Sequence, residues 1–177
     1  MSQSATLYRV SKEPFMQLNM PDNKQRFDFN MAKSDALFDG SFMALEYILS
    51  KGQDNSTIEI VKQIFSPEQA IGGQGFEGLT PEEHFEYYER RLYIPYLDAL
   101  IISKLNDFIS NFSDSDIRSK YYAKELNDNG IYPGVWHNNN SKDLAYNERQ
   151  ILEDFEALKI ILKQAYIEGD YIFVFVG

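Results

Sequence analysis

The sequence predicts an α+β fold in which several helices pack against a small mixed or antiparallel sheet. The chain has 177 residues, of which 44% are hydrophobic and 15% aromatic, enough to build the core of one domain. Segments with helical spacing of apolar residues are interspersed with short strand-like segments. The last segment, "YIFVFV" (171–176), is apolar on both faces, which is typical of a strand inside a covered sheet. We therefore expect residues 1–177 to form a single domain.

The first third of the chain contains three segments in which apolar residues recur at regular spacing. Residues 5–11, "ATLYRVS", alternate apolar and polar side chains and predict a strand. Residues 39–52, "DGSFMALEYILSKG", carry apolar side chains at helical spacing and end in a glycine, which predicts a helix. Residues 56–65 alternate isoleucine with polar residues and favour a strand, although a four-residue helical step also fits.

The middle of the chain begins with a loop. Residues 66–83 contain four glycines and two prolines, and Thr80 with Glu83 predicts the start of a helix. Residues 84–97 fit either a helix or a strand. Asp98 is expected to cap the helix that follows, with one apolar side. That side is formed by Leu100, Ile101, Leu105 and Phe108.

The last third is predicted to be mostly helical. Ser113 and Asp116 are expected to cap one short helix that Gly130 closes. A long helix over 146–168 is expected to end at Gly169. Its apolar stripe consists of Leu152, Phe155, Leu158, Leu162 and Ala165.

Charge and composition exclude several classes of function. There are 17 basic and 27 acidic residues, giving a formal net charge of −10. The one adjacent basic pair, Arg90–Arg91, is surrounded by glutamates, so nucleic acid is not an expected partner. No apolar run approaches the ~18 residues that a membrane helix needs, and cysteine is absent, which excludes disulfides and thiolate chemistry. Because no secretory signal is visible, we expect a cytoplasmic protein, with a basic protein as the best-suited partner.

Motifs of known chemistry are weak in this chain. "GQGFEG" (73–78) matches the dinucleotide pattern G-x-G-x-x-G formally, but no strand runs into it and no helix opens on it. His84 and His137 lie far apart in the sequence without a metal-binding spacing, so no metal is expected. Ser41 is not in a nucleophile elbow. We therefore assign no catalytic residue and expect no cofactor, although the many carboxylates leave an acid–base pair possible in principle.

The stretch "GIYPGVWHNNN" (130–140) is the best candidate for a binding site. Residues 131–134 predict a turn, because proline fixes φ and glycine accepts a positive φ. The single tryptophan that follows has two interpretations: it packs into the core, or it projects with its neighbours into a cleft beside acidic residues of 39–52. The residues assigned to this candidate cleft are Asp39, Phe42, Glu46, Tyr132, Trp136 and His137.

Three stretches resemble the YfbM-like proteins, a family of unknown function. The first stretch is "LNDNGIYPGVW", together with the long helix after it and the final "YIFVFVG". The other two are "DGSFMALEYILSKG" and "SPEQAIGG". Together they extend from Asp39 to Gly177. Asp39 stands at the acidic position of the family, whereas three positions depart from its pattern. At these departures Gly40 replaces a lysine, Phe42 a tryptophan and Glu46 a histidine. Tyr132, Pro133 and Trp136 match directly. The resemblance implies an α+β fold and an intracellular protein, but no reaction.

Two functions from different classes follow from these observations. The first is a non-catalytic binding domain with an acidic surface, similar to an immunity protein or an antitoxin. The alternative is a small metabolite-acting enzyme that uses Asp39 or Glu46 as the base and His137 as the acid. A scaffold domain without a cleft is a third interpretation.

Overall fold

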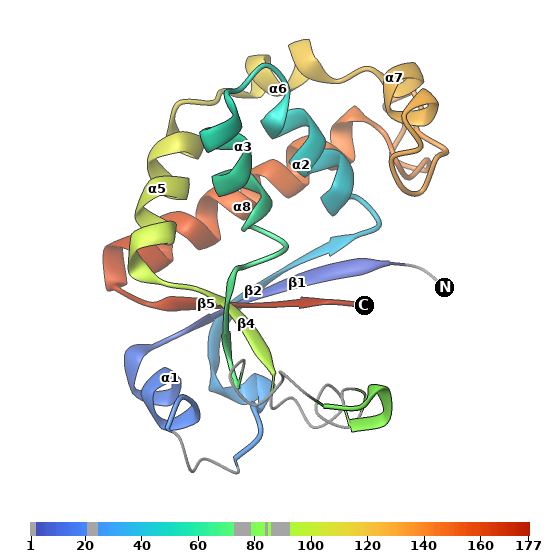
Figure 1. Ribbon diagram of the computed structural model, residues 1–177. Coiled ribbons are helices and arrows are strands. Elements are labelled where there is room, and N and C mark those ends of the chain that lie inside the picture. Colours follow the sequence, from blue (N-terminus) through green and yellow to red (C-terminus); the bar gives the residue numbers. More distant parts are fainter. Residues whose placement is uncertain (1–2, 21–24, 73–78, 84, 86–92) are drawn as a thin grey trace.

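The computed structural model describes residues 3–20, 25–72, 79–83, 85 and 93–177 (Figure 1). Within these ranges the strands form one sheet in the order β2-β1-β5-β4-β3, and every neighbouring pair is antiparallel. The strands are β1 (Ser4–Val10), β2 (Ala32–Asp39), β3 (Gln69–Ile71), β4 (Ile94–Leu97) and β5 (Tyr171–Val176). The expected α+β fold is confirmed, and its sheet is antiparallel.

One face of the sheet carries a thick layer of helices and the other carries a thinner cover (Figure 1). The thick layer contains α2 (Phe42–Ser50), α3 (Asn55–Lys62), α5 (Ala99–Ser110), α6 (Asp114–Lys120), α7 (Ala123–Asp128) and α8 (Glu148–Glu168). The thinner cover contains α1 (Lys12–Leu18) and the short 3-10 helix η1 (Phe29–Met31). The helix α8, 21 residues long, runs along the sheet and contacts α5, α2 and β2.

Strand β5 lies inside the sheet, as its two apolar faces predict. It pairs with β1 along its whole length and with β4 at Phe173 and Ile172. Ile172 and Val174 contribute to the main core under the helical layer, whereas Phe173 belongs to the smaller core on the other face. Because both faces of this strand are buried, nearly every side chain along it contributes apolar burial.

Residues 55–62 form the helix α3, so the strand prediction for 56–65 is wrong. The Asp54 carboxylate caps this helix by accepting a hydrogen bond from the Thr57 amide at 2.8 Å. Val61 is fully buried and Ile64 and Phe65 follow in the turn after the helix. Over so short a segment, the alternating isoleucines fit both the two-residue period of a strand and the helical period. The N-cap at Asp54 and the packing of the helix decide the conformation here.

Two details of the later helices also differ from the prediction. The buried side of α5 consists of Ile102, Leu105 and Ile109, whereas Leu100 is exposed, so the predicted face was rotated. The single short helix expected before Gly130 is two helices, α6 and α7, because Tyr121 and Tyr122 adopt extended backbone angles between them. A pattern of short helices does not show in the sequence where one ends and the next begins.

The helix starts predicted at Asp98 and Ser113 and the helix end predicted at Gly169 are confirmed. The Asp98 carboxylate accepts from the Ile101 amide at 2.9 Å, and Ser113 forms a reciprocal capping box with Asp116. Gly169 ends α8 with a φ of 67°, a left-handed conformation that glycine adopts without strain.

Several sequence features fall outside the described residues. These are the "GQGFEG" stretch, His84 and the Arg90–Arg91 pair. Within the described ranges, no helix is both long enough and apolar enough to cross a membrane.

Candidate binding site at the end of the sheet

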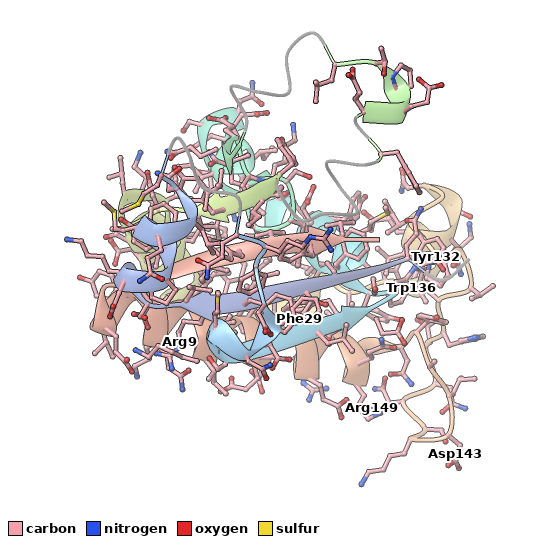
Figure 2. The ribbon with its side chains drawn as sticks, turned by 90° about the horizontal axis from the view of Figure 1, so that it is seen from below. Arg9, Phe29, Tyr132, Trp136, Asp143 and Arg149 are labelled. Carbon is pink, nitrogen blue, oxygen red and sulfur yellow. The ribbon has the colours of Figure 1, made fainter. Side chains whose placement is uncertain are left out.

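Three of the predicted site residues, Asp39, Tyr132 and Trp136, lie where β1 begins and β2 ends. Figure 2 shows Tyr132 and Trp136 beside these strand ends, with Arg9 toward the opposite end of the sheet. The Gln3 amide donates a hydrogen bond to the Tyr132 hydroxyl at 3.2 Å, which joins the loop to the start of β1. The Gln150 side chain of α8 donates to the Asp39 carbonyl at 3.1 Å. Three distant segments of the chain therefore meet at this end of the sheet.

Trp136 is a core residue. Its side chain is 3% exposed, and its indole Nε1 donates to the Ile131 carbonyl at 3.0 Å. The Asn127 side chain accepts from the Trp136 amide at 2.8 Å and donates to the Trp136 carbonyl at 3.0 Å. Because its polar groups are satisfied inside the protein, Trp136 holds the loop against α7.

Tyr146 connects this buried tryptophan to the end of β2. Its ring lies edge-on to Trp136, with the ring centroids 5.7 Å apart, and also lies against Gly40. A Cβ at Gly40 would be 2.8 Å from Tyr146 Cε1, and Gly40 has a φ of 71°. Glycine is therefore required at the position where the YfbM-like pattern has lysine. Burial, followed by the charges of Asp39 and Tyr132, raises the pKa of the Tyr146 hydroxyl.

Ser41 and Asp154 form a pair of interacting polar side chains, and the charge of Asp39 acts on Asp154. Ser41 is fully buried at the N-cap of α2, yet its side chain caps nothing. Both Ser41 Oγ and Asp154 Oδ2 are buried without a hydrogen bond of normal geometry. Burial raises the pKa of Asp154 to about 6; the nearby Ser41 hydroxyl opposes this shift, and the charges of Glu153 and Asp39 add to it.

The other predicted site residues have different surroundings. Phe42 is buried, and its ring packs 5.4 Å from that of Phe65. Burial raises the pKa of Glu46, and the charge of Lys62 on α3 partly opposes that shift. His137 fixes the loop through its backbone, since its amide donates to the Tyr146 carbonyl and its carbonyl accepts from the Tyr121 hydroxyl.

The structure thus brings together Asp39, Tyr132 and Trp136, with Tyr146 between them. Sequence reasoning missed Tyr146, Ser41 and Asp154 as site residues. Ser41 carried a signal as the residue before a helix, and Asp154 carried one as a carboxylate within an apolar helix pattern. Tyr146 carried none, because it lies in a loop with an unusual positive φ of 58°.

The chemistry of this site is that of a carboxylate cluster. Among the described residues, no three histidine or acidic side chains are grouped so that they could hold a metal ion. A partly buried carboxyl with a raised pKa can exchange a proton near neutral pH or accept a cationic group.

These features define an α+β domain with a five-stranded antiparallel sheet, a helical layer and an acidic cluster at one end of the sheet. The chain belongs to the family described as "Domain of unknown function (DUF1877)", whose pattern matches residues 1–175. The crystal structure of YfbM from Escherichia coli, a protein of unknown function, is similar in fold, with a TM-score of 0.57. The two chains are 16% identical, and the match covers 100% of each. No curated protein matches the chain significantly.

Proposed function

We propose that this chain is a non-catalytic binding domain for a basic protein. The observation that supports this proposal is the way the chain uses its positive charges. Eight of the described basic side chains form salt bridges with carboxylates of the chain itself. These residues are Arg9, Lys33, Lys51, Lys62, Arg118, Lys124, Arg149 and Lys159.

Each internal ion pair neutralises one cation and one carboxylate, so the net charge of −10 stays with the remaining carboxylates, and the chain presents mostly negative potential to its surroundings. A surface of this kind repels anionic ligands and accelerates encounters with a positively charged protein. Immunity proteins and antitoxins that neutralise basic toxins depend on the same physics, and we assign this chain to that type of binder.

The test is affinity capture followed by kinetics. Wild-type protein is immobilised and exposed to an extract of its own cells, and retained proteins are identified by mass spectrometry. We expect a basic protein whose association rate falls steeply as salt rises, because screening weakens long-range attraction. The retained protein is then produced in pure form, so that its association rate is measured at several salt concentrations.

The control compares two double variants. One neutralises two acidic residues at the site, and the other neutralises two exposed acidic residues away from it. Asp39→Asn with Asp154→Asn removes two charges at the site, whereas Asp35→Asn with Asp143→Asn removes two elsewhere. We expect the first pair to slow association more than the second. An association rate that does not change with salt would contradict the proposal.

The raised pKa of Asp154 favours a second candidate function, a small metabolite-acting enzyme. Asp154 would then accept the proton, in place of the predicted arrangement of Asp39 or Glu46 with His137, because a carboxyl with a pKa of about 6 exchanges protons readily near neutral pH. A thermal-shift screen with a metabolite library tests this. We expect the screen to find a ligand that the protein converts to a product. The rate of this turnover should rise as pH increases through 6, and Asp154→Asn should abolish it. A ligand that binds without being converted would contradict the enzyme.

A further inference from the structure

Within the described ranges, strand β2 is the longer of the two strands at the edges of the sheet. It has eight residues and, of the described strands, pairs only with β1, whereas β3 at the other edge has three residues. In Figure 2, β2 (light blue) lies along the outside of the sheet beside α8. An edge strand leaves a row of backbone N–H and C=O groups unpaired, and another chain of suitable sequence can pair with them.

The hydrogen bonds at the end of β2 show which of its residues direct their backbone groups outward. The Asp39 carbonyl accepts from the Gln150 side chain outside the sheet, whereas the amide of the next residue, Gly40, donates at 2.9 Å to the segment that leads into β1. Because successive residues of a strand alternate in direction, Leu37 and Asp35 also direct their N–H and C=O groups away from β1. Among the described residues, none forms a hydrogen bond with these four outward groups.

The two ends of β2 are protected, but its middle is open. A β-bulge interrupts the pairing with β1 near Ala32, and the Gln150 side chain occupies the carbonyl of Asp39. Between these two points lies Leu37, whose side chain is 57% exposed. Protection against unwanted pairing accounts for charges and bulges on an edge strand, but it does not account for an exposed leucine beside open backbone groups. The middle of β2 therefore has the features of a surface that another strand covers.

The charges beside this open edge favour a basic segment. Asp35 and Asp39 flank Leu37 on one face of β2, because side chains two residues apart share a face. The charges of Asp39 and Glu153 both act on Asp154, so negative charge is concentrated at the Asp39 end. A second copy of this chain would bring a net charge of −10 against the same edge, and like charges on paired strands are destabilising. A basic side chain opposite Asp39 stabilises the pairing instead.

We propose that an extended segment of the basic partner pairs with the outer edge of β2 as an added antiparallel strand. This inference rests on the proposed function and gives it a mode of binding. The residue opposite Leu37 exchanges two backbone hydrogen bonds with it and carries an apolar side chain that covers the leucine. A lysine or arginine two residues away lies opposite Asp39, and the backbone pairing continues at Asp35. The backbone bonds supply affinity, and the two side chains supply specificity.

The experiment uses a short peptide, so that it does not depend on knowing the partner. The probe is acetyl-Lys-Thr-Val-Thr-Ser amide, whose lysine and valine lie opposite Asp39 and Leu37 in an antiparallel pair. One control peptide has N-methylvaline, which keeps the charge and the side chains but lacks the amide that faces Leu37. A second control peptide has glutamate in place of lysine. NMR follows the backbone amide signals of Asp35 and Leu37 in the full chain, at the same ionic strength for all three peptides.

We expect the probe to move the amide proton signals of Asp35 and Leu37 downfield in a saturable way, because both amides gain a hydrogen-bond acceptor. The dissociation constant should lie in the millimolar range, since a short flexible peptide loses much of its conformational freedom when it pairs. The N-methylvaline peptide should bind several-fold more weakly, because it cannot donate to the Leu37 carbonyl. The glutamate peptide should leave both signals unchanged.

A variant of the protein removes the same hydrogen bond from the other side. Leu37→Pro lacks the outward amide of this residue and should abolish the effect of the probe on the Asp35 signal. The variant should fold, because proline is tolerated on an edge strand where the missing N–H would face solvent. Leu37→Val, the matched control, keeps the amide and an apolar side chain and should bind the probe like the wild type.

The outcomes separate this inference from the proposed function. If the probe leaves the signals of Asp35 and Leu37 in place, or if the N-methylvaline peptide binds equally well, strand pairing at β2 is overturned, and capture of a basic partner is unaffected by that result. If the probe pairs with β2 and no basic protein is captured from the extract, the edge site stands and the proposed function fails. A captured basic protein that binds Leu37→Pro as tightly as Leu37→Val would support the proposed function and overturn the edge site.

Discussion

Asp154 makes the stability of the folded chain depend on pH. Burial raises its pKa in the fold to about 6, against an ordinary value of 3.8. The folded state therefore holds this proton more tightly than the unfolded state, and stability falls as pH rises from about 4 to 6. Above that window the full cost of the buried charge is present, about 2 to 3 kcal/mol for a shift of this size.

We predict that Asp154→Asn stabilises the protein by about 2 kcal/mol at pH 7.5 and has almost no effect at pH 4. Asparagine has a similar shape and never ionises, so the variant does not pay the free-energy cost of a buried charge at pH 4 or at pH 7.5. Urea unfolding curves at pH 4, 5, 6, 7 and 8 give the difference directly. Asp143→Asn, exposed in the loop before α8, should show no such trend (Figure 2). A stability difference that stays constant over this range would contradict the raised pKa.

Single residues also show why the site was only partly predictable from the sequence. The pattern around residues 130–140 drew attention to Tyr132 and Trp136; Tyr146 lies edge-on to Trp136 and feels the charges of Asp39 and Tyr132, while Trp136 itself is buried in the core. The requirement for Gly40 comes from the ring of Tyr146, which the chain supplies from a distant loop. No local propensity encodes such a contact, because it exists only once β2 and that loop are in place.

For the helices and strands, the sequence predicted where a helix begins or ends better than which side of it is buried. Caps depend on one side chain and a few backbone amides, so Asp98, Ser113 and Gly169 could be recognised locally. The identity of α3 and the buried side of α5 depend on which neighbours they pack against. Those neighbours come from the whole fold, and tertiary packing overrides a weak local period.

The turn between α8 and β5 is tied to the sheet by a buried ion pair. Arg9 on β1 lies 3.1 Å from the Asp170 carboxylate, and both side chains are almost fully buried. Arg9 also pairs with Glu168 at 2.9 Å and donates to Ser34 Oγ at 3.0 Å, while Lys33 pairs with Asp170 at 3.0 Å. This cluster joins β1 and β2 to the last turn of α8.

We predict that Asp170→Asn costs roughly 2 to 3 kcal/mol of unfolding free energy. Removing one partner of a buried pair typically costs about 3 to 5 kcal/mol, and Glu168 remains to hold part of the charge of Arg9. Lys124→Ala, which breaks the exposed pair with Asp128, should cost less than about 0.5 kcal/mol. Denaturant unfolding at one pH measures both. Equal costs for the two variants would show that the Arg9 cluster does not anchor the turn.

For the whole molecule, the sequence predicted the class of the fold but not the order of its strands. β5 could be placed inside the sheet because both of its faces are apolar. Its partner β1 comes from the other end of the chain, with Ala5 opposite Val176 and Val10 opposite Tyr171. Turn signals predict pairing between neighbours in sequence, whereas pairing between the two ends leaves no local trace.

This pairing of the two ends predicts how the molecule opens. β1 is hydrogen-bonded to β2 on one side and to β5 on the other along nearly its whole length, and α8 covers the sheet beside it. β3 has three residues at the sheet edge, and α1 lies on the thinly covered face (Figure 1). Amides of β1, β5 and α8 should therefore exchange with solvent only through global unfolding.

Native-state hydrogen exchange at increasing, sub-denaturing urea tests this. Amides of β1, β5 and α8 should give the largest opening free energies, equal to the free energy of global unfolding, with a strong dependence on urea. Amides of α1 and β3 should open at lower free energy with little dependence on urea, because local opening exposes little surface. If all five elements shared one opening free energy, both faces of the sheet would belong to one cooperative unit, and the thin cover would be as stable as the helical layer.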